Sequence, residues 1–189
     1  MIARRSLLGR FARETRATAA TEFALLVPML IILLFVGAEA GHFVWTQHKL
    51  VEAVRDGARY ASRLPVHEVC EGANSIIAGT PNEDNVKLVT LTGQLTNPND
   101  LDDLDDPYVW RTVPGWTAAQ VTVNVDCEQF TADADPDVPT GIYTDLGAPG
   151  PIVTVSATSV TYPSLFNLLA GLSRGVSLSA RSNAAVIGI

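Results

Sequence analysis

The longest apolar run in the chain lies near its N-terminus and predicts a helix that crosses a membrane. No charged residue occurs between Phe23 and Ala38. If Glu39 and His42 are tolerated, the run extends to Trp45, and as a helix it would span roughly 34 Å. The hydrocarbon core of a bilayer is about 30 Å thick, so we expect the helix to cross it and to place Trp45 at the far interface, where tryptophan is enriched.

After Trp45 the pattern becomes one-sided, as in an amphipathic helix outside the membrane. Apolar or small residues recur every three or four positions, and charged residues fall mostly on the opposite side. Pro65 should end this helix, because the residue before a proline is disfavoured in the helical conformation. Residues 20–64 are therefore predicted to form one helix. Small residues on its inner face would let another element pack close to the backbone: Ala53, Gly57, Ala58 and Ala61.

Beyond Pro65 the apolar positions alternate with a period of two, which predicts strands. The alternation is clearest at Val121, Val123 and Val125. Strands with one apolar face indicate an antiparallel sheet with one buried side, and the small-residue helix face is its natural partner. The fold class is therefore α+β, with a sheet of three or four strands. The predicted strands lie within 85–92, 118–127, 151–162 and 174–189, and residues 163–175 are expected to form a short amphipathic helix or loop.

Charge is distributed unevenly and sets the expected orientation. Residues 1–17 hold five arginines and one glutamate, a charge of +4, whereas the whole chain carries −7 and the remainder therefore −11. Short basic arms stay in the cytoplasm, while long domains are translocated largely regardless of charge. The expected segments are a cytoplasmic leader at 1–17, a transmembrane helix at 18–46, its amphipathic extension at 47–64 and an extracytoplasmic β-rich domain at 65–189.

The two cysteines, Cys70 and Cys127, both fall in the segment expected outside the cytoplasm. In an oxidising compartment such a pair predicts a disulfide, and two separate buried thiols are the alternative. The chain has no Cys-x-x-Cys motif, so neither a metal nor a redox site is expected.

Two acidic segments, 99–108 and 133–141, interrupt the strands. Their aspartates are of the type that binds calcium, but the second segment lacks the glycine and glutamate of a calcium loop, so solvated loops are the favoured interpretation. No Gly-x-Ser-x-Gly motif and no phosphate-binding glycine-rich loop occurs, and the three histidines are scattered. We therefore expect no enzymatic activity, no cofactor, no bound metal ion and no nucleic-acid partner.

The segment "RATAATEFALLVPML" and the later "GAEAGHFVWTQHKLVEAVRDGARYAS" together resemble the TadE-like family of pseudopilins of the tight-adherence (Flp-type) pilus. The resemblance is strongest over residues 16–62, and the closing segment "VTYPSLFNLLAGLSRGVSLSARSNAAV" is similar to the end of family members. It implies a minor pilin-like subunit that assists assembly or initiation of the pilus. Its implied partners are a prepilin peptidase, other pseudopilins or pilins, the assembly platform and the inner membrane.

The resemblance also implies roles for residues at the entrance of the apolar run. A prepilin peptidase would cut between Ala17 and Thr18, which makes Glu22 the fifth residue of the mature chain, followed by Phe23. Family members usually carry glycine before the cut, so Ala17 departs from the pattern. Glu22 would pair with the free amino terminus of a neighbouring subunit and set subunit register, since a paired charge costs less in lipid than a single one. The alternative is a carboxylate hydrated among lipid headgroups.

Three other interpretations remain open from the sequence. "AEA" at 38–40 is similar to a signal-peptidase site, in which case a secreted module would begin at Gly41. "ARRSLL" hints at a twin-arginine signal. The uncleaved chain could also be a membrane anchor that presents a binding domain or a calcium-dependent adhesive domain.

Overall fold

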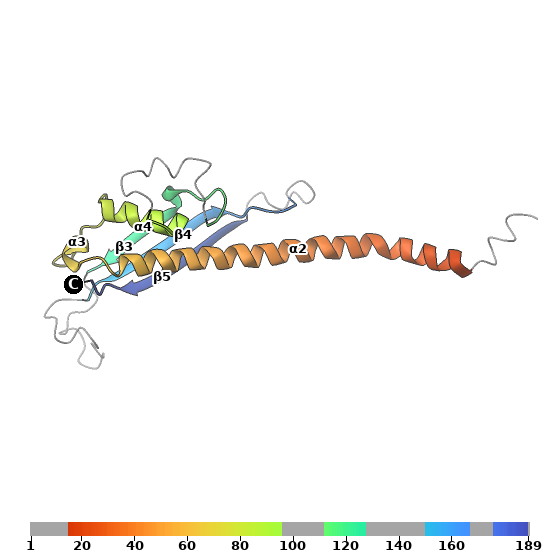
Figure 1. Cartoon of the computed structure of the whole chain (residues 1–189), viewed down its shortest axis with the longest axis horizontal. Coiled ribbons are helices and arrows are strands. Elements are labelled where there is room, and N and C mark those ends of the chain that lie inside the picture. Colours follow the sequence, from red (N-terminus) through yellow and green to blue (C-terminus); the bar gives the residue numbers. More distant parts are fainter. Residues whose placement is uncertain (1–14, 96–111, 128–149, 167–175, 189) are drawn as a thin grey trace, which may run out of the picture. The chain divides into compact units, whose positions relative to one another are not determined.

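The computed structural model describes residues 15–95, 112–127, 150–166 and 176–188, with side chains from residue 19 onward (Figure 1). It has the predicted α+β composition, a long N-terminal helix and a small antiparallel sheet. The chain divides into two units, residues 1–42 and residues 43–189, and each is described by itself. The elements are helices α2 (Thr15–Ala61), α3 (Val66–Val69) and α4 (Pro81–Thr92), the 3₁₀ turn η2 (Ala118–Gln120), and strands β1 (Cys70–Glu71), β2 (Asn74–Ser75), β3 (Val121–Asp126), β4 (Ile152–Thr161) and β5 (Ser177–Ala185).

Helix α2 confirms the prediction of one continuous helix, although it begins at Thr15 and ends at Ala61, both earlier than predicted. It is 47 residues long and contains Pro28. Residues 62–64, predicted to be helical, lie beyond the end of α2, because the backbone there forms tighter turns. Arg63 N donates to Tyr60 O at 3.0 Å and Leu64 N donates to Ala61 O at 3.2 Å. Such i to i+3 bonds are common where a helix ends, and Pro65 prevents its continuation.

The three longer strands form one antiparallel sheet in the order β3-β4-β5 (Figure 1). Valines with buried side chains face one another across β3 and β4, as in the pairs Val123 with Val155 and Val125 with Val153. Along β3 buried and exposed positions alternate as the sequence predicted, from Val121 to Val125, and Asp126 at the end is half-buried. The opposite face of the sheet carries exposed polar side chains such as Asn124. One side of the sheet therefore belongs to the core and the other faces solvent.

The prediction of a strand over residues 85–92 is wrong, because this segment belongs to helix α4. The physical reason is local capping. Thr80 accepts a hydrogen bond from Glu83 N, Pro81 occupies the first turn, and Gly93 ends the helix in the left-handed conformation at φ 73°. Proline at the start and glycine just past the end are the favoured punctuation of a helix. These caps outweigh the β-branched composition of the segment, and its buried side chains join the core.

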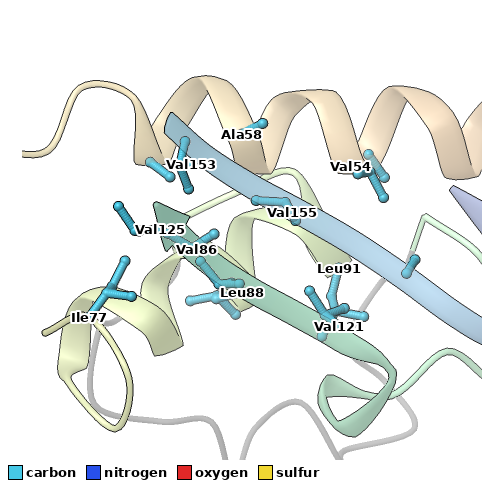
Figure 2. Packing of buried hydrophobic residues seen from close by; sticks show 14 of the residues in the cluster. Val54, Ala58, Ile77, Val86, Leu88, Leu91, Val121, Val125, Val153 and Val155 are labelled. Carbon is cyan, nitrogen blue, oxygen red and sulfur yellow. The ribbon is translucent and has the colours of Figure 1, made fainter. Parts of the chain in front are cut away.

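The core of the second unit is a single cluster that combines α2, α4 and the sheet. Figure 2 shows members of this cluster from α2 (Val54, Ala58), α4 (Val86, Leu88, Leu91), β3 and β4. Trp116, which precedes η2, is fully buried in it. The helix that supplies the predicted membrane span thus also supplies part of the core of the folded domain.

Candidate membrane and assembly helix

The first half of α2 exposes apolar side chains. Leu25, Met29 and Leu33 are each more than 70% exposed. Within the described residues one helix, spanning Ala19–Ala61, is long and apolar enough to cross a membrane, with a mean hydropathy of 2.4 in its most apolar stretch. Exposed apolar surface of this extent is unfavourable in water and marks a membrane or protein contact. This half of α2 is therefore a candidate membrane span.

The residues predicted for processing and assembly lie at the start of this helix. Ala17 and Thr18 belong to α2, but their side chains are outside the described part of the structure. Glu22 and Phe23 are exposed, with Phe23 at 63%. Glu22 lies four positions after Thr18, a rise of about 6 Å in a helix. The predicted cut and the roles of Glu22 and Phe23 remain predictions.

The transition from exposed to packed helix occurs within about two turns, from residue 43 to residue 50. The ring of Phe43 contacts that of Tyr162 edge-on, with centroids 5.2 Å apart. Thr46 and Leu50 are buried, whereas Trp45 is 54% exposed. The Lys49 ammonium lies 4.0 Å from the centroid of the Trp45 ring, a cation–π contact.

The second half of α2 packs through the small residues that the sequence singled out. Ala53, Gly57, Ala58 and Ala61 are all buried. Their predicted partner, the sheet, belongs to the same core cluster. The structure adds helix α4 as a partner, because a side chain at Gly57 would overlap the hydroxyl group of Thr90.

Helix α2 and the residue after it are hydrogen-bonded to β5 and to the segment that follows β5. Gln47 Nε2 donates to Ser179 O at 3.0 Å, and Ile187 N donates to Ser62 O at 2.8 Å. These two bonds show that helix and strand run in the same direction over some fifteen helical residues, about 22 Å. These two bonds attach α2 to β5 near the start of the strand and just beyond its end.

The predicted disulfide is confirmed. Cys70 in β1 and Cys127, just after β3, are bonded, with their Cα atoms 6.0 Å apart. Both cysteines are buried. The bond ties the segment that follows α2 to the end of the sheet.

Both acidic segments, 99–108 and 133–141, lie outside the described residues, as does most of 163–175. Within the described ranges no group of three or more acidic, histidine or cysteine side chains is arranged to hold a metal ion.

The carboxylate of Glu83 has a structural role in helix α4. Glu83 on α4 accepts hydrogen bonds from Lys87 Nζ and from Gly79 N, each at 2.6 Å. Burial alone would raise the pKa of Glu83, but these hydrogen bonds and the charge of Lys87 together lower it.

Reasoning from the sequence missed three features. The start of α4 carried a signal that was overlooked, a threonine followed three residues later by a glutamate, Thr80 and Glu83. The close approach of Gly57 and Thr90 and the contact between Phe43 and Tyr162 join distant segments. No local sequence pattern predicts contacts between segments that are distant in sequence.

Comparison with known proteins finds a family match for the N-terminal helix. The family model described as TadE-like protein matches residues 17–59, so the chain is TadE-like over most of helix α2. The matched residues include the predicted cleavage position, the candidate membrane span and most of the packing face. The match points to involvement in tight-adherence (Flp-type) pilus systems. No curated protein and no solved structure matches the chain.

Proposed function

We propose that the protein is a minor pilin-like subunit, non-enzymatic, that assists assembly or initiation of a tight-adherence pilus. The observation that carries the proposal is the coincidence of the TadE-like match with a helix of two different halves. The first half exposes apolar side chains and the second is built into a folded domain. A subunit of this kind can be stored in a membrane and can later associate with neighbours through the same helix.

The proposal includes a location and a processing step. The N-terminus lies in the cytoplasm, α2 crosses the inner membrane, and the disulfide-bonded domain is extracytoplasmic. The disulfide supports this placement, because disulfides persist mainly in oxidising compartments. A prepilin peptidase removes residues 1–17, after which Glu22 faces the amino terminus of a neighbouring pilin or pseudopilin at the assembly platform.

The experiment that tests the proposal is to determine the N-terminus and intact mass of the protein recovered from the membranes of its native host. A chain that begins at Thr18 is expected, with the mass of a disulfide-bonded product. A soluble chain that begins at Gly41 would overturn the proposal in favour of a secreted module. A chain that retains Met1 in the membrane would contradict processing and favour an anchored binding domain.

A further inference from the structure

The β4–β5 end of the folded domain lies beside the place where α2 leaves its exposed apolar stretch. Tyr162, just after β4, contacts Phe43 of α2. Tyr162 N donates to Val176 O at 3.1 Å, so the start of β5 is held at the same place. The end of β4 and the residue before β5 therefore both lie near Phe43, at the same position along the axis of α2.

The alignment of β5 with α2 places Val176 at this level independently. Ser179 is bonded to Gln47, and β5 runs in the same direction as the helix. Val176 precedes Ser179 by three residues, about 10 Å along a strand, whereas Phe43 precedes Gln47 by about 6 Å along the helix. Val176 therefore extends at least to the level of Phe43.

At this level the domain exposes apolar side chains from both segments. Val44 and Trp45 of α2 are each 54% exposed, Leu165 is 54% exposed and Val176 is 39% exposed. Lys49 lies beside them, with its ammonium against the ring of Trp45. We call these five residues the proximal rim. Apolar side chains beside an aromatic ring and a lysine form the composition typical of a membrane–water interface.

We propose that the proximal rim rests on the surface of the bilayer that α2 crosses, so that Leu165 and Val176 contact lipid as a second attachment beside the helix. The proposal rests on the membrane insertion in the proposed function, and the occupant it names is the lipid surface. The argument for lipid is continuity, because Val44 and Trp45 lie at the C-terminal end of the exposed apolar stretch of α2 that is the candidate membrane span. The surface of a bilayer surrounds the helix that crosses it. It can therefore contact rim residues that lie on different sides of α2. Lys49 would meet headgroup phosphates, whose charge is opposite to its own.

The test uses full-length protein with its native disulfide, reconstituted into vesicles of phosphatidylethanolamine and phosphatidylglycerol. A cysteine introduced as Leu165→Cys carries an environment-sensitive fluorophore, and lipids with a nitroxide near the headgroup act as quencher. Asn183→Cys is the matched control, because Asn183 is also exposed but lies toward the other end of β5. We expect quenching at least about twofold greater at 165, since interfacial groups enter the bilayer boundary by about 5–10 Å.

Equal quenching at residues 165 and 183 would overturn the proposal. A fluorophore at residue 165 that reports an apolar environment only while the protein is concentrated in the lipid would also overturn the proposal. In that case a second copy of the chain would cover the rim. Flotation of the vesicles separates this result from a failure of the proposed function. Protein that does not float with lipid contradicts insertion of α2, whereas floating protein without quenching contradicts only the rim.

Discussion

Gly57 shows how the absence of one side chain permits two helices to approach. It lies on the buried face of α2, and a Cβ atom there would overlap Thr90 Oγ1 on α4. Thr90 is fully buried, and its hydroxyl group donates to Val86 O at 2.7 Å. The spacing between α2 and α4 therefore depends on glycine at this position.

We expect Gly57→Ala to lower the free energy of unfolding of the domain by about 1–3 kcal/mol, the usual cost of overpacking a core. Gly41→Ala on the same helix is the control, because nothing lies within 4 Å of a Cβ atom there. Thermal unfolding in detergent, followed by near-UV circular dichroism, measures both. Thr90→Ala removes the overlapping oxygen and should reduce the cost of Gly57→Ala. If Gly57→Ala lowered the free energy of unfolding equally in the wild type and in Thr90→Ala, the result would contradict a close contact between positions 57 and 90.

Glu83 predicts how stability changes at acid pH. Its pKa is lowered in the folded state from an ordinary value of 4.5. The ionised form is therefore favoured by folding, so its stabilising contribution is complete above pH 4.5 and is lost as the pH falls through the lower, folded pKa. We expect the difference in melting temperature between the wild type and Glu83→Gln to shrink over that range.

The matched control for this prediction is Asp56→Asn. Asp56 forms a salt bridge with Arg59 at 3.3 Å, but both side chains are more than half exposed, and such pairs contribute little. Its substitution should change the melting temperature slightly at every pH. A difference for Glu83→Gln that stays constant from pH 7 to pH 3 would show that the hydrogen bonds of α4 do not depend on the charge.

At the scale of elements, the sequence predicted α2 and the strands β3, β4 and β5, because periodic patterns of apolar residues report directly on burial. The alternation at Val121, Val123 and Val125 corresponds to one buried face in the sheet. The pattern failed at α4, where alternating valine and leucine residues resembled a strand although Thr80 and Gly93 define a helix. Short segments are ambiguous in this way, and capping residues then decide between the two structures.

The candidate site was predictable to a similar extent. The membrane span and the disulfide could be expected from composition, charge and cysteine count. The hydrogen bonds that join Gln47 to Ser179 and Ser62 to Ile187 could not, because they depend on how a helix and a strand distant in sequence align. Pairings of this kind are fixed by tertiary packing and leave no local pattern.

The disulfide should contribute strongly to the stability of the domain. It closes a loop across a sequence separation of 57 residues, which corresponds to about 4 kcal/mol in the chain-entropy account. We expect the variant Cys70→Ala/Cys127→Ala to unfold at clearly lower urea concentration. Mass spectrometry after maleimide treatment of unfolded protein checks the bond itself. No label is expected without reductant and two labels after reduction, so labelling without reductant would contradict the bond.

At the scale of the whole molecule, one helix serves two environments. Up to residue 42 its apolar side chains are exposed, and from Thr46 onward it is part of a core. The domain buries its apolar side chains in its own core, whereas the exposed half of α2 would bury its apolar side chains in lipid or against the same half of other subunits. Insertion into the membrane and assembly with other subunits would therefore use the same surface of α2. Substitution of a residue that acts only in assembly should impair assembly and leave membrane insertion unchanged.

Glu22 is the residue for which we predict this separation. Glu22→Gln keeps the shape of the side chain but removes its charge, so the pair with the amino terminus of a neighbouring subunit cannot form. We expect the variant to float with membranes as well as the wild type does. Its co-purification with partner pseudopilins should fall several-fold, because a charge that loses its partner inside a membrane is costly.

Glu39→Gln provides the matched control, since Glu39 lies in the same helix and has no assigned role in assembly. Equal loss of co-purification in the two variants would mean that negative charge in α2 matters in general and that Glu22 has no special partner. Unchanged co-purification of Glu22→Gln would place this carboxylate among lipid headgroups. Loss confined to Glu22→Gln, with membrane flotation intact, is the result that a carboxylate used to set subunit register requires.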